Sequence, residues 1–211
     1  PVKSYRPGSK ERETLQYRYD KMASQTIEIP IIIGGQYIKT GKTETCVMPH
    51  DHQHILATYH KAGEKQALQA IDNAMDTWKE WSKTSLSKRV HIFHKAAELL
   101  KGPWRDTINA ATMLNQSKNA YQAEIDSACE LIDFFNFNAE YAENIYNEQN
   151  LISPVDTKNS LEYRALEGFV FAITPFNFTS IAANLPCAPA LMGNVAIWKP
   201  ASSSVYSGYF L

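Results

Sequence analysis

The fold is decided by two stretches, GFVFAITPFNFT (residues 168–179) and APALMGNVAIWKPASS (residues 188–203). Each contains an apolar run without alternating polar residues, FVFAIT in the first and VAIWK in the second. Such runs are typical of parallel strands that are covered on both faces of a sheet. A helix is expected between them over residues 180–192, ended by Gly193 and Asn194. The order strand, helix, strand predicts a βαβ unit.

Polar residues follow both predicted strands at the same edge of the sheet. Asn177 lies in the turn after the first strand, and Lys199 lies at the end of the second. Ligands bind at the carboxyl ends of strands in an open parallel sheet. A lysine there can donate to ribose hydroxyls, and a helix N-terminus favours a phosphate. The sequence has no GxGxxG motif. The spacing of Asn177 and Lys199 alone therefore supports a nucleotide site and an ordinary sheet edge equally.

Each of these residues also has an ordinary structural interpretation. Asn177 is a good N-cap residue for the helix that follows it. Lys199 has the position of a solvated lysine at a strand end. Glu130 lies on a long predicted helix with three other acidic residues, so a solvated face or an ion pair is its default interpretation.

Upstream, the pattern predicts helices and a small β meander. Residues 9–24 form a first expected helix with Ser9 as N-cap, and residues 25–60 hold short strands with a Gly34-Gly35 hairpin turn. Three further helices are expected where apolar residues recur at helical spacing. Their apolar residues are Ala67, Ile71, Ala74, Trp78 and Trp81; Val90, Phe93, Ala97 and Leu100; and Ile125, Ala128, Ile132, Phe135, Ala139, Ala142 and Tyr146. Gly102-Pro103 ends the second, and the two tryptophans are expected to pack between helices.

The composition is that of an ordinary water-soluble globular protein. The chain has 211 residues, 44% of them hydrophobic and 20% charged, with a formal net charge of -1. This balance gives no reason to expect nucleic acid or an anionic membrane as a partner. No apolar run approaches the ~20 residues of a membrane helix. The first residues lack a signal-peptide core and a transit-peptide pattern.

The cysteines and histidines are expected to have structural roles. Cys46, Cys129 and Cys187 are odd in number and far apart, so a reducing compartment fits, and each has apolar neighbours, as buried structural thiols do. In HDHQH, His50 and His54 flank a third histidine at alternate positions, which on a strand would share one face. The segment has the composition of a turn, so we expect no metal site.

The quoted stretches resemble the aldehyde dehydrogenase superfamily, in which a P-[FW]-N-F turn precedes the helix and a K-P motif ends the next strand. The finer resemblance is to the 1-pyrroline-5-carboxylate dehydrogenases, also called glutamate semialdehyde dehydrogenases. It rests on PFNFT, APALMGN, WKP, QAEIDSACELIDFFNFNAEYA and PGSKERETLQ. The resemblance covers essentially the whole chain, which corresponds to the N-terminal portion of members that are more than twice as long.

The resemblance implies an aldehyde dehydrogenase-like α/β fold in three parts. Residues 1–150 would be the N-terminal helical and β-meander part of the NAD-binding domain. Residues 151–167 would be an oligomerisation flap, whose strands pair across a dimer in the superfamily, so a homo-oligomer is expected. Residues 168–211 would be the first βαβ unit of the Rossmann-like NAD-binding fold.

The resemblance also implies site roles. Asn177 matches the asparagine whose side-chain amide donates to the oxyanion of the reaction intermediate. Thr174 matches a cofactor-contacting position, and Lys199 matches the lysine that binds the adenosine ribose of NAD. Ser202 stands where many members carry a glutamate that shares this ribose, which makes a strict preference for NAD over NADP less secure.

Two further residues match positions close to the substrate. Phe178 matches an aromatic residue that packs against the aliphatic stem of the substrate, and Glu130 matches a helix carboxylate near the substrate pocket. Pro186 departs from the usual residue and is expected to kink its helix. The cysteine nucleophile and the glutamate base would both lie downstream of the K-P motif, and Cys187 and Glu167 are not assigned to those roles.

The implied activity is the NAD-dependent oxidation of L-glutamate γ-semialdehyde to L-glutamate in proline degradation. A cysteine thiohemiacetal carries the reaction, so residues 1–211 alone are expected to be inactive. Two alternatives remain open: an aldehyde dehydrogenase with another substrate, and a non-enzymatic interaction module. The compartment would be the cytoplasm in a bacterium and the mitochondrial matrix in a eukaryote.

Overall fold

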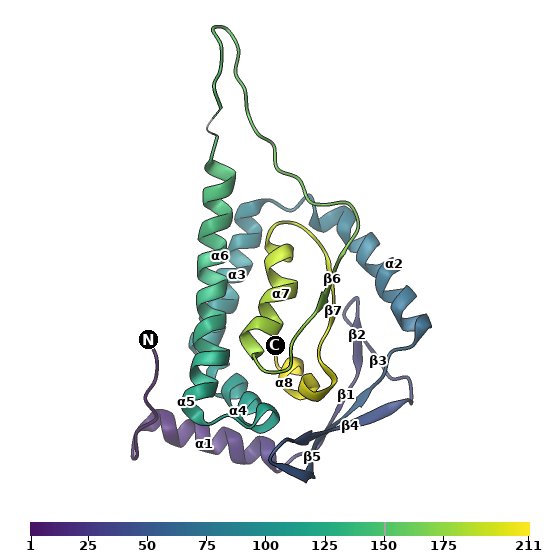
Figure 1. Ribbon diagram of the computed structural model, residues 1–211, viewed down its shortest axis with the longest axis vertical. Helices are drawn as coiled ribbons and strands as arrows, with labels where there is room; N and C mark the ends of the chain where they lie inside the picture. The colour runs from purple at the N-terminus through teal and green to yellow at the C-terminus, as the bar shows by residue number, and fades with distance from the viewer. Residues whose placement is uncertain (150) are drawn as a thin grey trace.

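The computed structural model describes residues 1–149 and 151–211. It has a body of helices and small sheets, from which one long loop projects beyond the end of α6 (Figure 1). The helices are α1 (Lys10–Ala23), α2 (Glu64–Trp81), α3 (Leu86–Lys101), α4 (Arg105–Gln116), α5 (Ala120–Ala123), α6 (Glu130–Asn147), α7 (Thr179–Leu191) and α8 (Val205–Tyr209). The strands are β1 (Ile27–Ile29), β2 (Ile31–Ile33), β3 (Gln36–Ile38), β4 (Thr43–Met48), β5 (Asp51–His60), β6 (Val170–Ile173) and β7 (Ala196–Lys199).

The predicted βαβ unit is present as β6, α7 and β7. The two strands pair in parallel, from Val170 opposite Ala196 to Ile173 opposite Lys199. The turn after α7 contains Gly193, whose φ of 90° suits glycine. Pro186 lies inside α7, and the helix nevertheless continues to Leu191.

The prediction that the sheet is covered on both faces is wrong for the described part of the chain. Phe171 and Ile173, which share one side of β6, have exposed fractions of 54% and 61%. Ala172, between them, is buried at 4%. The alternation arises because α7 packs on the sheet, whereas the opposite side of β6 has no cover within the described residues.

The N-terminal strands are not a simple meander, because β1 pairs in parallel with β5 and the order of the first sheet is β1-β5-β4. The hairpin prediction is confirmed, since β2 and β3 are antiparallel and Gly34 and Gly35 have φ values of 57° and 74°. The HDHQH segment was expected as a turn. Instead, Asp51 begins β5, and the turn is confined to Pro49 and His50.

Two features of the helices differ from the prediction. The helix α4 was not predicted; most of its residues are buried, including polar ones such as Asn109 and Thr112. The helix expected over residues 125–146 is continuous, but Glu124–Cys129 forms a π-helical turn before α6. Such turns often lie at functional sites.

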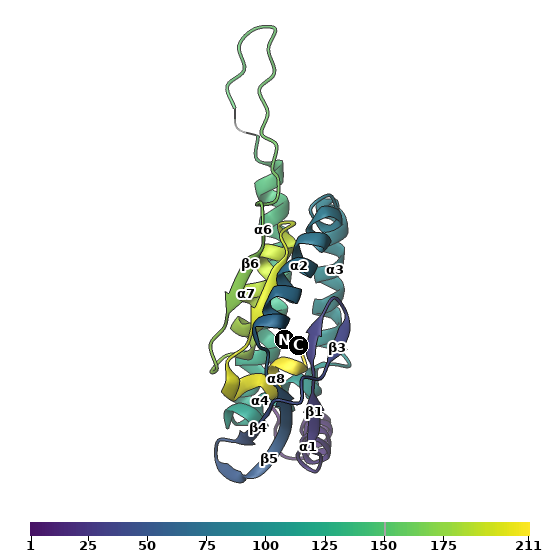
Figure 2. The same ribbon diagram turned by 90° about the vertical axis from the view of Figure 1, so that its right-hand side faces the viewer.

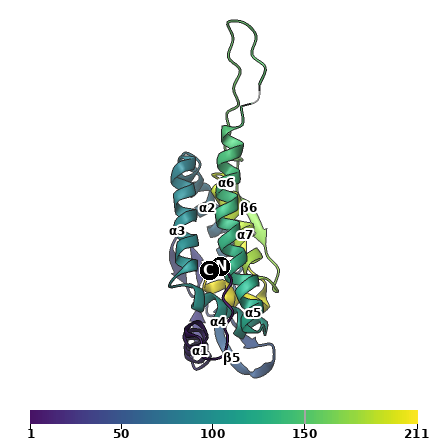
Figure 3. The ribbon, with the colours of Figure 1, turned by 90° about the vertical axis from the view of Figure 1, so that its left-hand side faces the viewer.

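The interior contains two apolar clusters. One joins α1, the first sheet and α4, and the other joins α3, α6 and α7. Figure 3 shows α3 and α6 running side by side. The two tryptophans of α2 attach this helix to the βαβ region: Trp78 Nε1 donates to the Leu166 carbonyl at 2.8 Å, and Trp81 Nε1 donates to the Ala190 carbonyl at 2.9 Å.

The segment 151–167 projects beyond the end of α6 and returns to the body, where Ala165 is buried and the Leu166 carbonyl accepts from Trp78 (Figures 1 and 2). No strand is assigned among its residues. Ile152 and Val155 are 92% and 89% exposed, so this segment presents apolar side chains far from the core. No helix among the described residues is long and apolar enough to cross a membrane.

Candidate active site

The carboxyl edge of the β6–β7 sheet brings Thr174 and Lys199 together. The backbone N–H of Thr174 donates to the Lys199 carbonyl at 3.3 Å, and its Oγ1 accepts from Trp198 Nε1 at 2.9 Å. Lys199 is exposed, and its Nζ donates to the Pro200 carbonyl at 3.3 Å. Parallel pairing therefore places the two predicted cofactor residues at one edge, as the topology requires.

Ser202 follows this edge in a short 3-10 turn, Ser202–Ser204, and is exposed. Tyr59, at the end of β5, donates its hydroxyl to Glu44 Oε2 at 2.9 Å, and Glu44 also pairs with Lys61. Burial, followed by the contact with Glu44, raises the pKa of Tyr59. The Glu44 carboxylate of β4 is thus held by Tyr59 and Lys61, contacts that sequence reasoning missed.

Asn177 lies in the turn between β6 and α7, and its side chain is exposed. The N-cap position of α7 falls on Phe178, and no side-chain hydrogen bond caps this helix. The interpretation of Asn177 as the N-cap residue is therefore wrong. Asn177 follows Thr174 by three residues, and its side chain does not cap α7.

Glu130 reaches the same region from the first turn of α6. Ser180 Oγ donates to Glu130 Oε2 at 2.6 Å, and Ser180 is buried in the first turn of α7. The structure thereby connects Glu130 to the helix that follows Asn177 and Phe178. The default interpretation of Glu130 as part of a solvated acidic face is wrong, because this carboxylate is half-buried and hydrogen-bonded.

The acidic residues near Glu130 have quite different surroundings. Glu124 is 0% exposed and belongs to a buried polar network, Asp126 pairs with Lys118 at 2.6 Å, and Asp133 is exposed. Sequence reasoning also missed Lys118, which donates to the backbone carbonyl of Asn177 and lies 4.3 Å from the centroid of the Phe178 ring.

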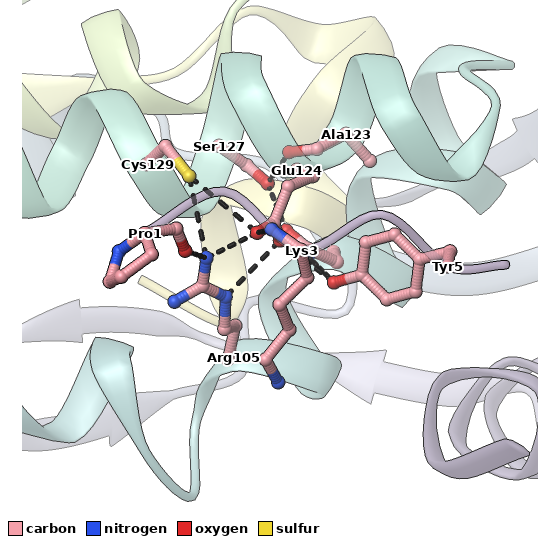
Figure 4. A network of polar contacts seen from close by, with 9 residues as sticks. Pro1, Lys3, Tyr5, Arg105, Ala123, Glu124, Ser127 and Cys129 are labelled. Carbon is pink, nitrogen blue, oxygen red and sulfur yellow. Dashed lines mark hydrogen bonds and ion pairs between the residues drawn. The ribbon is translucent and has the colours of Figure 1, made fainter. Parts of the chain in front are cut away.

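The buried network around Glu124 joins the start of the chain to α4 (Figure 4). Its carboxylate accepts from the Lys3 backbone N–H at 2.7 Å, the Tyr5 hydroxyl at 2.7 Å and the Asn109 amide at 2.8 Å, and it pairs with Arg105. Burial alone would raise the pKa of Glu124, but these donors, led by Arg105, lower it to about 2. The network holds the π-helical turn that precedes α6.

The cysteines differ in part from expectation. Cys187 is half-buried, and burial raises its pKa to about 11. Cys129 was expected among apolar residues, but Arg105 Nη2 lies 3.4 Å from its sulfur and Glu124 Oε1 lies 3.6 Å away. Burial and then Glu124 raise its pKa to about 11, and burial raises that of Cys46. A raised pKa disfavours the reactive thiolate at neutral pH.

The histidines of HDHQH contact different parts of the structure. His50 Nδ1 lies 2.7 Å from Ser117 Oγ, and His54 Nε2 lies 2.8 Å from the Ala23 carbonyl. No group of three histidine, cysteine or acidic residues that could hold a metal ion occurs among residues 1–149 and 151–211.

Two exposed polar side chains lie at or just after the edge of β6 and β7. The Lys199 ammonium is exposed, and its long hydrogen bond to the Pro200 carbonyl leaves further N–H groups available to donate. The exposed hydroxyl of Ser202 lies three residues further on. These donors fit a ribose better than they fit an apolar ligand.

A model of the aldehyde dehydrogenase family matches residues 37–211. The chain is 45% identical over 212 residues to the delta-1-pyrroline-5-carboxylate dehydrogenase of Agaricus bisporus, covering 100% of this chain and 39% of that protein. It is 44% identical over 209 residues to the mitochondrial delta-1-pyrroline-5-carboxylate dehydrogenase of Homo sapiens, covering 99% of this chain and 37% of that protein.

Solved structures agree with these relatives. The delta-pyrroline-5-carboxylate dehydrogenase of Mycobacterium tuberculosis, determined with bound NAD, has a TM-score of 0.97 and 46% identity, with 99% of this chain and 39% of that chain covered. Nearly the whole chain is aligned with these relatives, but it spans only 37% to 39% of their length. The fold is an aldehyde dehydrogenase-like α/β fold, and the chain belongs to the aldehyde dehydrogenase family.

Proposed function

We propose that the full-length protein oxidises L-glutamate γ-semialdehyde, formed from 1-pyrroline-5-carboxylate, to L-glutamate with NAD in proline degradation. The observation that carries this proposal is that Thr174 and Lys199 meet at one sheet edge, with Asn177 three residues after Thr174 in the chain. It is supported by relatives named 1-pyrroline-5-carboxylate dehydrogenase that match the chain from end to end.

Asn177 would stabilise the oxyanion that forms when a thiolate adds to the aldehyde. Its amide is exposed directly after β6 and does not cap α7, so it can donate to negative charge that develops beside the turn. Phe178 would pack against the aliphatic stem of the substrate. Glu130 would help to shape the substrate pocket, because its hydrogen bond with Ser180 holds the first turn of α7.

Lys199 and Ser202 would bind the adenosine ribose of NAD, and Thr174 would contact the cofactor at the strand end. When bound, NAD supplies the acceptor for the hydride that leaves the substrate. Ser202 carries no charge that would repel a 2′-phosphate, and the Glu44 carboxylate is paired with Lys61, so the proposed site does not strictly discriminate against NADP.

The cysteine nucleophile and the glutamate base are proposed to lie in the part of the protein beyond residue 211, in line with the 39% coverage of the relatives. We also propose the domain division given by the resemblance: residues 1–150, the flap 151–167, and the first βαβ unit from 168 to 211. The extended flap, with its exposed Ile152 and Val155, would pair with a second copy in a homodimer or larger homo-oligomer.

The compartment would follow the source organism. The relatives from Dictyostelium discoideum and Homo sapiens are named mitochondrial. A eukaryotic source would therefore place this protein in the mitochondrial matrix, and a bacterial source would place it in the cytoplasm.

The substrate assignment can be tested with the full-length protein by following NADH formation. We expect kcat/KM for glutamate semialdehyde to exceed that for an aliphatic aldehyde of equal length by about 100-fold or more, because a site built for a polar group rejects an analogue that lacks it. A preference for the aliphatic aldehyde would reject the substrate. The absence of any NADH formation with either aldehyde would reject the dehydrogenase function.

Replacing Lys199 tests the cofactor role. In Lys199→Met, we expect the Kd for NAD to rise about 10- to 100-fold, because a charge-assisted hydrogen bond is lost. Lys88→Met, on the exposed side of α3, is the matched control and should leave the Kd unchanged. Equilibrium binding by fluorescence titration measures both, and an unchanged Kd in Lys199→Met would remove Lys199 from the site.

A further inference from the structure

Lys118 ties the loop between α4 and α5 to the turn that carries Asn177. Its Nζ donates to the Asn177 backbone carbonyl and to Asp126 Oδ2, the latter at 2.6 Å. The same ammonium lies 4.3 Å from the centroid of the Phe178 ring, within the range of a cation–π contact. A single side chain therefore contacts both residues that immediately precede α7.

Asp126 is itself fixed, because it lies within the π-helical turn Glu124–Cys129. Glu124, two residues before it, is buried at 0% exposure and clamped by Arg105. Glu130, four residues after it, accepts from Ser180 in α7. Asp126 thus contacts the Asn177 turn through Lys118. Glu130 contacts α7 through Ser180, so the two carboxylates hold the chain on either side of Phe178.

The location of Lys118 is unfavourable for a cation unless it has partners. Its side chain is 14% exposed, so its ammonium has lost much of its hydration. It also lies near the N-terminus of α7, where the helix dipole repels positive charge. Asp126 and the Asn177 carbonyl compensate both costs, and they also leave the ammonium with one defined position.

We propose that Lys118, held by Asp126, is a positioning residue that fixes the backbone of Asn177 and the ring of Phe178 for the reaction. This inference rests on the proposed function, in which Asn177 holds the oxyanion and Phe178 holds the substrate stem. Without the bond to its carbonyl, the Asn177 turn can move. A displacement of about 1 Å is sufficient to cost on the order of 100-fold in rate.

The test uses the full-length protein with Lys118→Met, which keeps most of the side-chain volume and removes the charge. We expect kcat for glutamate semialdehyde to fall about 10- to 100-fold. The KM for NAD should change by less than about twofold, because the ribose-binding edge is not touched. Lys95→Met is the matched control: it breaks the exposed Lys95–Glu98 pair on α3 and should leave kcat unchanged.

A double-mutant cycle distinguishes positioning from general damage. Because Lys118 acts through Asn177, Lys118→Met should lower kcat much less in an Asn177→Ala background than in the wild type, whereas unrelated defects would multiply. Asp126→Asn should lower kcat by a smaller factor, and this factor should also shrink in the Asn177→Ala background. If Lys118→Met does not fold, the Asp126→Asn cycle tests the positioning role in its place.

The outcomes separate this inference from the function on which it rests. Wild-type activity together with full kcat in Lys118→Met overturns the inference alone. Effects that multiply fully with Asn177→Ala overturn it as well. A wild-type protein that oxidises no aldehyde overturns the proposed function, and the inference with it.

Discussion

Replacement of Asn177 by alanine is expected to lower kcat for aldehyde oxidation by about 100- to 1,000-fold, the usual cost of losing one oxyanion donor. The structure makes this expectation specific, because the exposed amide of Asn177 follows β6 directly and does not cap α7. A residue with a structural role alone would show a loss of stability instead. The Kd for NAD should remain close to that of the wild type, since Lys199 and Thr174 are unchanged.

The measurement is a steady-state comparison in the full-length protein. Asn184→Ala is the matched control, because Asn184 lies on α7, the helix after the Asn177 turn, and its side-chain oxygen accepts from Asn138 at 2.8 Å. We expect this control to keep kcat within about threefold of the wild type. If Asn177→Ala also stays within that range, the assignment of the oxyanion donor is wrong.

The sequence was sufficient to predict the βαβ unit, because its strands are short apolar runs and its turns contain glycine and proline where such turns need them. Parallel topology then brings Thr174 and Lys199 to one edge without further information. The pairing of β1 with β5 could not be predicted in this way. Ile27 lies opposite Ala57, and the order of short strands in a sheet is decided by tertiary packing.

The contacts around the candidate site were less accessible than its edge. Lys118 looks like an ordinary loop lysine, and its bond to Asn177 spans 59 positions of sequence. Glu124 carried a usable signal that was missed. It precedes Ala128 by four residues and Phe135 by eleven, so helical spacing places it on the buried face of its helix. A carboxylate on such a face needs a buried partner.

Arg105 is the buried partner of Glu124. Replacing Glu124 is therefore the substitution expected to lower the free energy of unfolding most. We expect Glu124→Gln to lower the free energy of unfolding by about 3–5 kcal/mol, because the Arg105 guanidinium, 5% exposed, would stay buried without a counter-charge. The double variant Glu124→Gln, Arg105→Met should recover part of this loss. Asp76→Asn is the control, since the exposed pair of Asp76 with Lys79 contributes less than about 1 kcal/mol.

The same carboxylate predicts how stability depends on pH. Burial would raise the pKa of Glu124, but its donors, led by Arg105, lower it from 4.5 to about 2 in the folded state. Because the folded pKa lies below the unfolded value, its stabilisation is complete above about 4.5 and is lost as the pH falls toward 2. Denaturant unfolding of both proteins should therefore show the difference between wild type and Glu124→Gln shrinking over this interval. A difference that stays constant down to the lower limit would mean that the Glu124 charge does not stabilise the fold, and that the network stabilises it through packing and neutral hydrogen bonds alone.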